Sequence, residues 1–303
     1  MNRPLPCVLA WMACSCGAGA MVCGAESADQ RTAGNRAIAK GRSSEKRNRP
    51  ERSAKRMEIV VHRGANHLAP ENTMASARKA VELGADYVEV DIRRSADGVM
   101  YVIHDPNVAR TTDGSGYIKK MTSEQIDKLD AGSWFDPKFK GQRVPRLRTL
   151  LEWIGGKCKV YFDVKDADLG ELTKLIYELK MQDDVFFWFG DRRQALRLRR
   201  LDKELPLKIN VKEAKQLRWA KRAFGATIVE TSVEAATPAF IRQANRMGIR
   251  VMILYTGSDP EVFRRIIRSG AQMVNLDRLT VFLDVWREEQ RKAASKPNRD
   301  GSR

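Results

Sequence analysis

Short apolar runs and helical stretches alternate along the chain beyond Met57, and this alternation constrains the fold more than any other feature of the sequence. Continuous apolar strands that alternate with helices predict a parallel sheet covered by helices on its outer face. The apolar runs are Glu58–His62, Tyr87–Asp91, Lys159–Lys165, Val185–Phe189, Leu207–Val211, Thr227–Thr231, Arg250–Thr256 and Met273–Leu276. The helical stretches are Asn72–Leu83, Leu147–Trp153, Leu169–Lys180, Arg192–Leu201, Lys212–Phe224, Pro238–Met247 and Pro260–Ser269.

Eight strands with their helices in about 230 residues suit a (β/α)₈ TIM barrel of the α/β class, which places its active site at the C-terminal ends of the strands. A doubly wound parallel sheet is the alternative. The barrel is favoured because His62, Asp91 and Lys165 lie at the ends of the strands. Residues 57–290 are therefore predicted to form one barrel domain.

One further apolar run, Val99–His104, follows the second strand after only an Asp-Gly pair. Asp-Gly between two extended runs is a strong signal for a two-residue β-hairpin. With such a loop Ala96 pairs with Val99, and Asp91 then lies opposite His104. Directly opposed residues project to the same face, so this register predicts that His104 returns to the level of Asp91.

The first 25 residues have the composition of a secretory signal peptide. A short basic start precedes residues 4–25, which carry no charge and are rich in Ala, Cys, Val, Met and Gly. A membrane anchor and a start codon placed too early are the alternatives. Export to the periplasm or the cell exterior is therefore predicted. Lipid attachment is disfavoured, because the residues before Cys14, Cys16 and Cys23 match a lipoprotein signal poorly.

Residues 26–56 and 291–303 are predicted to be a disordered basic linker and a disordered tail, because they contain too little apolar surface to offset the entropy of ordering. Peripheral contact between the linker and an anionic surface is one interpretation of its charge, and a solvated spacer is the favoured one. Only Cys158 lies beyond the first 25 residues, which excludes an internal disulfide framework in the folded part.

The chain carries a formal net charge of +17, which favours anionic partners such as phosphate esters or acidic surfaces. It has no nucleic-acid-binding signature, so no nucleic-acid partner is predicted. The oligomeric state is left open.

Three carboxylates lie on strands that are otherwise apolar. Glu89 and Asp91 are two residues apart and share one face of the second strand, and Asp163 precedes Lys165 at the same spacing. A like-charged pair among apolar neighbours costs stability unless a cation lies between the carboxylates. Oxygen-only ligation suits a hard divalent ion better than zinc. One divalent cation, Mg²⁺ or Ca²⁺, is therefore predicted at Glu89, Asp91 and Asp163.

Basic side chains and imidazoles accompany these acids. The Arg63 guanidinium presents a planar fork suited to phosphate oxygens, and Lys165 offers a compact charge. His62 and His104 lie at strand ends that flank the carboxylate pair, and imidazoles titrate near neutrality, so the two could act as acid and base in phosphoryl transfer. The third histidine, His67, is interpreted as a loop residue.

These residues fall within a series of short motifs, which are His62-Arg63-Gly64, Ala69-Pro70-Glu71-Asn72-Thr73, Glu89-x-Asp91, Asp97-Gly98, His104-Asp105, Arg110-Thr111-Thr112-Asp113-Gly114-x-Gly116, Leu129-Asp130-Ala131-Gly132-x-Trp134-Phe135 and Val144-Pro145. In order and spacing the series resembles the signature of the glycerophosphodiester phosphodiesterase family. The likeness is dense over residues 57–165 and sparse after them. It implies a barrel with a small insertion after the second-strand hairpin, at about residues 105–145, and metal-dependent hydrolysis of glycerophosphodiesters to glycerol 3-phosphate and an alcohol.

Carried over by position, the resemblance implies that His62 and His104 are the acid/base pair and that Arg63 holds the phosphate. It also implies that Glu89 and Asp91 bind the metal. The family usually has Glu in a Glu-x-Lys motif where this chain has Asp163-x-Lys165. The shorter Asp163 side chain would ligate the metal directly after a small shift, or through a water.

Two further positions are assigned to substrate by the resemblance. Glu71 would lie near the mouth of the barrel as a substrate contact, or would help Asn72 and Thr73 to cap the first helix. Tyr255 stands where the family has Trp and would cover the glycerol face of the substrate.

Two other functions are compatible with the sequence. The change at Tyr255 and the weak likeness over residues 185–211 leave the leaving alcohol open between choline, ethanolamine, inositol and a longer phosphodiester. The basic linker and Tyr255 also allow a lysophospholipid or another membrane-derived diester as the first alternative substrate. A non-catalytic barrel that binds phosphodiesters is the second alternative. It is disfavoured because such a protein has no need of both His62 and His104.

Overall fold

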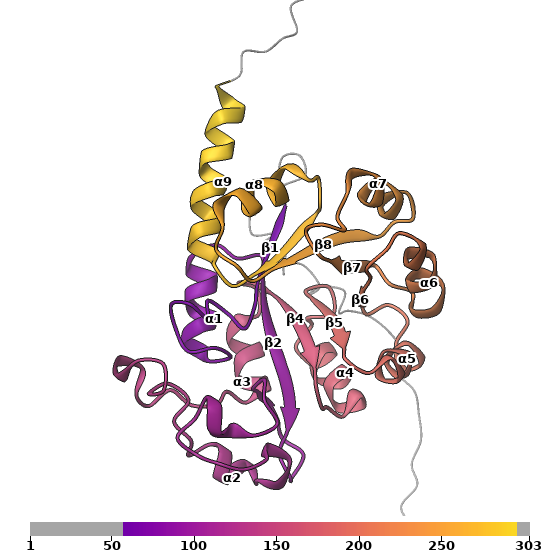
Figure 1. Ribbon diagram of the computed structural model, residues 1–303. Coiled ribbons are helices and arrows are strands. Elements are labelled where there is room, and N and C mark those ends of the chain that lie inside the picture. Colours follow the sequence, from indigo (N-terminus) through magenta and orange to yellow (C-terminus); the bar gives the residue numbers. More distant parts are fainter. Residues whose placement is uncertain (1–56, 296–303) are drawn as a thin grey trace, which may run out of the picture. The chain divides into compact units, whose positions relative to one another are not determined.

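The computed structural model describes residues 57–295, which form a barrel with one insertion (Figure 1). Its parallel strands are β1 (Glu58–Val61), β2 (Tyr87–Arg94), β4 (Lys159–Val164), β5 (Val185–Phe189), β6 (Lys208–Asn210), β7 (Ile228–Thr231), β8 (Arg250–Tyr255) and β9 (Met273–Leu276). They neighbour one another in the order β5-β4-β2-β1-β9-β8-β7-β6. A bridge between Phe187 and Leu207 joins β5 to the start of β6, so the barrel is nearly closed. The predicted (β/α)₈ barrel is therefore confirmed.

Helices cover the outside of the barrel between successive strands (Figure 1). Many of them begin at a Thr or Asp whose side chain accepts a backbone amide hydrogen, as Thr73 and Asp259 do. The sequence did not predict the last helix, which runs four residues past the expected end of the domain at position 290. The helices are α1 (Met74–Glu82), α3 (Leu147–Ile154), α4 (Leu169–Glu178), α5 (Arg192–Leu201), α6 (Lys215–Phe224), α7 (Pro238–Arg246), α8 (Pro260–Arg268) and α9 (Leu279–Ala294).

Side chains alternate along each strand between two apolar layers, because successive residues of a strand face opposite ways. On β2, Val88 and Val90 pack outward in the same cluster as the helices, whereas Tyr87 belongs to the interior cluster. This interior cluster forms a floor across the barrel from the first inward position of most strands. Its members are Val60, Tyr87, Tyr161, Phe186, Ile228, Met252 and Met273.

The hairpin strand β3 (Met100–Val102) pairs with β2 in a register that differs from the predicted one. Arg93 lies opposite Tyr101, so the partner of Asp91 is Ile103, whose amide donates to the Asp91 carbonyl over 2.9 Å. The predicted opposition of Asp91 and His104 is therefore wrong by one residue.

The loop of this hairpin explains the shift. Ser95 closes it by donating its amide to the Val99 carbonyl over 2.9 Å and by accepting the Val99 amide on its side-chain oxygen over 2.9 Å. Three residues then form the loop, and the last of them, Gly98, has a φ of 86°. A three-residue loop with a left-handed glycine is the next most common hairpin connection after the two-residue loop.

The insertion after the hairpin has an apolar cluster of its own, which includes Tyr101, Ile118 and Leu129. Asp130 organises its central loop by accepting the amide hydrogens of residues 141, 133 and 132, and these hydrogen bonds hold the pKa of the Asp130 carboxyl well below its usual range. A side chain at Gly132 would place Cβ 1.9 Å from the carbonyl oxygen of Phe139, so only glycine fits there. The regular elements are α2 (Ser123–Ile126) and short 3₁₀ helices at Val108–Arg110, Ile118–Lys120 and Pro137–Phe139.

Within residues 57–295, no helix has the length and apolar character needed to cross a lipid bilayer. The predicted signal peptide at 1–25, the linker at 26–56 and the last eight residues of the tail lie outside the described part of the chain. Export therefore stays a prediction.

Candidate active site

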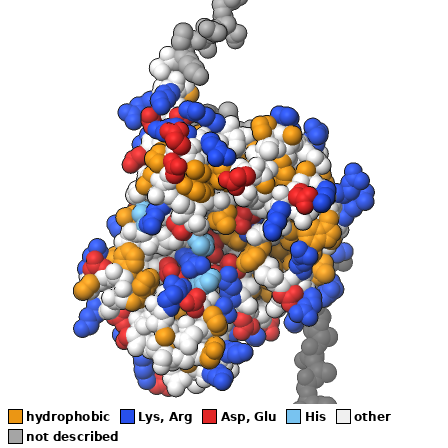
Figure 2. Space-filling view, viewed as in Figure 1, with side chains coloured by type: hydrophobic (Ala, Val, Ile, Leu, Met, Phe, Trp, Pro, Cys, Tyr) orange, Lys and Arg blue, Asp and Glu red, His pale blue; other side chains and the backbone are white. Residues whose placement is uncertain are grey.

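Polar side chains occupy the inward positions nearest the C-terminal ends of the strands. His62 directly follows β1, Glu89 and Asp91 lie on β2, and Asp163 lies on β4. Asp91 and Asp163 are register partners across the β2–β4 pair. On the face shown in Figure 2, histidine side chains lie near the middle, among acidic and basic ones. Barrel formation thus gathers residues that are up to 101 positions apart in the sequence.

Glu89, Asp91 and Asp163 form an acidic cluster that is almost fully buried. One carboxylate oxygen of each lies within 4.8 Å of those of the other two. Burial and the charge of Asp91 raise the pKa of Glu89 to about 8, and the same causes raise the pKa of Asp163. Oδ1 of Asp163 is buried and accepts no hydrogen bond from any described residue. Carboxylate oxygens with an unsatisfied acceptor fit a hard divalent cation.

Two neighbours orient the Asp91 carboxylate. Nζ of Lys165 lies 3.2 Å from Oδ1 of Asp91 and 2.6 Å from Oδ2 of Asp163. Nδ2 of Asn72 donates to Oδ2 of Asp91 over 2.8 Å. Three carboxylates thus face one ammonium and, from Arg63, one guanidinium, and this excess of carboxylates is a second reason to expect a cation there.

Arg63 adopts a left-handed backbone conformation directly after β1, with a φ of 56°. Its amide donates to Oε2 of Glu89 over 2.6 Å, and its Nε lies 3.5 Å from Oδ2 of Asp91. A residue other than glycine in this region costs about 1–3 kcal/mol and persists only where its surroundings demand it. The strained backbone of this turn therefore directs both the amide and the guanidinium of Arg63 toward the acidic cluster.

His62 is paired with an acid from the opposite end of the chain. Its Nδ1 lies 2.8 Å from Oδ1 of Asp277, which follows β9, and Asn66 donates to the same oxygen over 2.8 Å. Burial disfavours the imidazolium, but the Glu89 charge and the Asp277 hydrogen bond outweigh it and raise the pKa of His62 to about 9. Because Asp277 engages Nδ1, Nε2 is the nitrogen left to exchange a proton with a ligand.

His104 lies beyond β3 and connects to the site through a chain of ion pairs. Its Nδ1 lies 2.6 Å from Oδ1 of Asp105. Arg110 joins Asp105 to Glu71, and Glu71 also accepts from Nη1 of Arg63 over 3.0 Å. His104 is thus linked through ion pairs to Arg63, the residue that follows His62.

Glu71 is occupied by these two arginines. Burial opposes its ionisation, but Arg110 and Arg63 together hold the pKa of the Glu71 carboxyl below its usual range. The helix-capping role falls to Thr73, whose hydroxyl accepts the Ser76 amide. Glu71 is therefore an ion-pair partner of Arg63, the arginine that is expected to bind the phosphate.

A second buried charged cluster lies on β6, β7 and β9. Nζ of Lys208 donates to Oε1 of Glu230 over 2.9 Å, and Asn275 donates to Oε2 of Glu230 over 3.3 Å. Burial lowers the pKa of Lys208 although Glu230 opposes the shift. The ammonium also lies over two rings, with its nitrogen 4.8 Å from the centroid of Trp188 and 5.0 Å from that of Tyr161. This cluster lines the same cavity of about 140 Å³ as His62 and two of the acids, Glu89 and Asp163.

The sequence pattern of the Glycerophosphoryl diester phosphodiesterase family matches residues 62–281, a range that begins at His62 and includes Asp277. The chain belongs to this family.

Two curated relatives illustrate the likeness within the family. The glycerophosphodiester phosphodiesterase of Bacillus subtilis (strain 168) is 33% identical over 184 residues, which are 54% of this chain and 62% of that protein. The glycerophosphodiester phosphodiesterase of Caldanaerobacter subterraneus subsp. tengcongensis is 48% identical over 99 residues, which are 33% of this chain and 41% of that protein. The chain thus spans less than two thirds of the length of either relative.

Two solved structures extend the comparison. The crystal structure of the glycerophosphodiester phosphodiesterase from Agrobacterium tumefaciens str. C58 is 39% identical, with a TM-score of 0.73 that covers 76% of this chain and 100% of that one. An Oleispira antarctica phosphodiesterase is 22% identical, with a TM-score of 0.70 over 76% of this chain and 96% of that one, which shows a shared fold.

Family resemblance alone misplaces one predicted contact. Tyr255 occupies an outward position on β8, where its ring meets Phe263 of α8 at a centroid distance of 5.1 Å. Its hydroxyl accepts the amide hydrogen of Asp259 over 3.1 Å. The adjacent Leu254 points inward and lines the cavity. Leu254, rather than the predicted Tyr255, therefore lines the site. Side chains alternate along β8, and of these two neighbours Leu254 is the one that points into the barrel. His67, the predicted loop histidine, contacts Thr280 through Nε2 at 3.1 Å.

Sequence reasoning missed Asp277, Lys208 and Glu230. Asp277 follows the last strand as His62 follows the first, so the rule that strand ends carry the site could have identified it. Lys208 and Glu230 are single charged residues within short strands, and only the structure shows that they form an ion pair.

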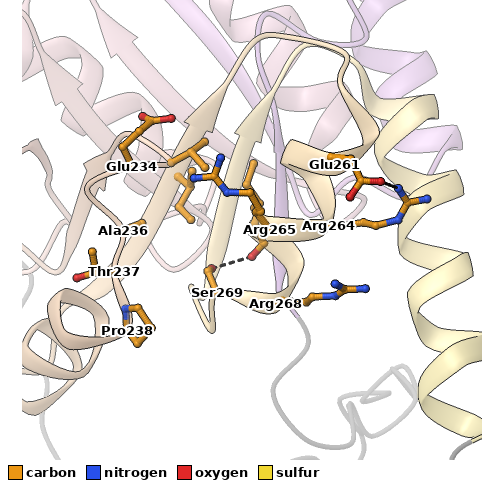
Figure 3. A pocket seen from close by; sticks show the side chains of 12 residues that line it. Glu234, Ala236, Thr237, Pro238, Glu261, Arg264, Arg265, Arg268 and Ser269 are labelled. Carbon is orange, nitrogen blue, oxygen red and sulfur yellow. Dashed lines mark hydrogen bonds and ion pairs between the residues drawn. The ribbon is translucent and has the colours of Figure 1, made fainter.

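A larger cavity of about 370 Å³ lies between α7 and α8 (Figure 3). Arg264, Arg265 and Arg268 give it a basic lining. However, Arg264 is bound by Glu288 and Arg268 by Glu289, both from α9. None of the predicted site residues lines this cavity, so it stands apart from the candidate active site.

Proposed function

We propose that this chain hydrolyses glycerophosphodiesters to glycerol 3-phosphate and an alcohol with the help of one divalent cation, Mg²⁺ or Ca²⁺, at Glu89, Asp91 and Asp163. The observation that carries the proposal is the buried acidic cluster in the same cavity as His62. Family membership supports it, since relatives are named for this activity. The Oleispira structure is described as a complex with the product sn-glycerol-3-phosphate.

A cation held by the three carboxylates would act as a Lewis acid toward the phosphodiester oxygens. Arg63 and Lys165 would bind the remaining phosphate oxygens, because both lie beside the expected cation site, within 3.5 Å of a carboxylate oxygen of Asp91. The water oxygen bonds to phosphorus while the bond from phosphorus to the alcohol oxygen breaks. One histidine of the pair His62 and His104 accepts the proton of the water, and the other protonates the departing alcohol.

The acids behind the histidines fix their orientation. Asp277 holds Nδ1 of His62, and Asp105 holds Nδ1 of His104, so each ring presents Nε2 to a ligand. This arrangement of a base oriented by a carboxylate recurs in acid/base catalysis because it selects one tautomer.

The proposal is tested with the full chain on glycerophosphocholine, glycerophosphoethanolamine and glycerophosphoinositol, each with EDTA, Mg²⁺ or Ca²⁺, by measuring released glycerol 3-phosphate. The variants His62→Ala and His104→Ala should each lower kcat by about 10²- to 10⁴-fold. His67→Ala is the matched control and should retain activity, since the His67 imidazole contacts Thr280 in the first turn of α9 rather than the acidic cluster. Absence of metal-dependent release from all three diesters would refute the proposal.

Two other outcomes of this assay would identify one of the alternative functions. Faster cleavage of lysophosphatidylcholine than of glycerophosphocholine would identify a lysophospholipid as the substrate. Binding of the diesters without turnover by the wild type, at every metal condition, would identify a non-catalytic phosphodiester-binding protein.

A further inference from the structure

Two cavities adjoin at the C-terminal ends of β6, β7 and β8. The inner one, of about 140 Å³, contacts the acidic cluster. The outer one, of about 430 Å³, begins at the same three residues, Asn210, Glu230 and Leu254, and extends to Arg192 and Lys212. Together they form a groove, called here the alcohol groove, that leads from the expected position of the phosphate toward α5 and α6.

The inner part of the alcohol groove offers little to a cationic ligand. Glu89 and Asp163, which also line this part, are assigned to the cation, and its third carboxylate, Glu230, is neutralised by Lys208 at 2.9 Å. Its indole, Trp188, already has two ammonium groups near its ring, Lys165 at 5.4 Å and Lys208 at 4.8 Å from the centroid. A quaternary ammonium binds best on an aromatic face beside unpaired negative charge. In this part of the groove, lysine ammonium groups already occupy the Trp188 face and pair with the Glu230 carboxylate.

The outer part of the alcohol groove is cationic. Among residues 57–295, neither Arg192 nor Lys212 has a carboxylate within ion-pair distance. The nearby acids are bound elsewhere: Asp191 pairs with Arg193 over 2.9 Å and Glu213 with Lys215 over 2.8 Å. The Arg192 guanidinium lies 4.7 Å from the ring centroid of Trp219, which supports it at the rim.

Buried acceptors along the same path lack partners. Oδ1 of Asn275, in the inner part, and the hydroxyl oxygen of Thr231, in the outer part, are buried and make no hydrogen bond within the described chain. A ligand that brings hydroxyl hydrogens would satisfy them, and an unsatisfied buried polar atom otherwise carries a cost in free energy.

We infer that the alcohol groove binds the alcohol part of the substrate and selects a hydroxyl-bearing alcohol that carries an anionic group, such as a phosphorylated polyol, over choline or ethanolamine. The glycerol part of the diester is uncharged and is common to all substrates of the proposed function, on which this inference rests. Only an anionic alcohol makes use of both Arg192 and Lys212, since guanidinium and ammonium groups bind phosphate oxygens strongly.

The test compares three substrates that differ in the alcohol alone: glycerophosphoinositol 4-phosphate, glycerophosphoinositol and glycerophosphocholine. The wild type should show the highest kcat/KM on the first and the lowest on the third, and raising the salt concentration should narrow the difference. The double variant Arg192→Gln/Lys212→Gln should lower kcat/KM on glycerophosphoinositol 4-phosphate by about tenfold, mainly through KM, and leave glycerophosphocholine unchanged.

The matched control is Arg193→Gln/Lys215→Gln, which removes the same charge from adjacent positions that do not line the alcohol groove. It should keep the wild-type order of substrates. A wild-type preference for glycerophosphocholine, or equal effects of the two double variants, would overturn the inference and leave the proposed hydrolysis intact. Failure of the wild type to cleave any of the three substrates would remove the proposed function and this inference with it.

Discussion

The barrel contains two buried charged clusters that differ in how their charge is balanced. Lys208, Glu230 and Asn275 form a set with one cation and one anion that are hydrogen-bonded to each other, although Oδ1 of Asn275 has no partner in the described chain. Glu89, Asp91 and Asp163 face one ammonium, that of Lys165, and one guanidinium, that of Arg63, and Oδ1 of both Asp91 and Asp163 is buried without a hydrogen bond from the described residues. Since buried charge is tolerated only when it is compensated, the first cluster is complete in charge and the second, with more carboxylates than close cations, is incomplete.

The largest expected effect follows from removing one acid of the incomplete cluster. Glu89→Gln should lower kcat/KM by about 10³-fold at saturating metal, because stabilisation by a bound metal is worth several kcal/mol in such reactions. The metal-free variant should fold at least as stably as the wild type, since glutamine carries no charge and its side-chain oxygen can still accept the Arg63 amide hydrogen. Retention of activity within tenfold, with undiminished metal binding by calorimetry, would show that Glu89 is not a ligand.

The complete cluster should respond in the opposite way. Glu230→Gln leaves the Lys208 ammonium buried without a counter-charge and should destabilise the protein by about 3–5 kcal/mol in urea unfolding. The double variant Glu230→Gln/Lys208→Met should recover most of this loss, because it removes both charges. If the double variant were as unstable as the single one, packing rather than charge balance would be the function of this pair.

Metal addition should stabilise the wild type and not Glu89→Gln. A cation at about 100 times its dissociation constant contributes about 2.7 kcal/mol, which corresponds to a rise in Tm of about 5–10 °C for a domain of this size. Thermal unfolding with and without Mg²⁺ or Ca²⁺ measures it. An equal rise in Tm for both proteins would place the ion elsewhere.

The pH dependence of the metal-free protein reports on the same carboxyl. The pKa of Glu89 is raised to about 8 from its ordinary value of 4.5, so between these values the folded state holds a proton that the unfolded state has released. The Glu89 contribution to stability is therefore largest below pH 4.5 and is lost as the pH rises to 8. Unfolding curves at pH 6, 7 and 8 should show a steeper loss in the wild type than in Glu89→Gln, in which the raised pKa of His62 still contributes a loss above pH 6.5.

The smallest expected effect concerns orientation. Asp277→Asn should lower kcat/KM by about 10- to 100-fold, a range typical of residues that position a functional side chain. It should also move the limb of the pH–rate profile that belongs to His62 to lower pH, because the Asp277 hydrogen bond raises the pKa of His62. An unchanged profile together with the activity loss would mean that Asp277 acts only on the fold.

The sequence predicted best those features that a local apolar pattern and a position at the end of a strand both indicate. Apolar strand runs identified the sheet, and residues at their ends identified the acidic cluster. The β2–β3 register was wrong because a Ser95 side chain, rather than the Asp-Gly pair, closes the hairpin loop. The inward position of Leu254 was missed because neighbouring strands fix the phase of β8.

The contacts that escaped prediction join distant parts of the chain. His62 and Asp277 are 215 positions apart, and Lys208 and Glu230 are on different strands. No periodicity within either segment indicates that such residues meet, because barrel closure alone brings them together.

The pairing of β1 with β9 has a consequence for the order in which the site forms during synthesis. The three carboxylates leave the ribosome before β9, which Asp277 directly follows, begins to be made. At about 5–20 residues per second, the growing chain spends several seconds with those acids present and the partner of His62 absent. The contact between His62 and Asp277, on which the proposed acid/base role depends, thus forms only when β9 reaches β1.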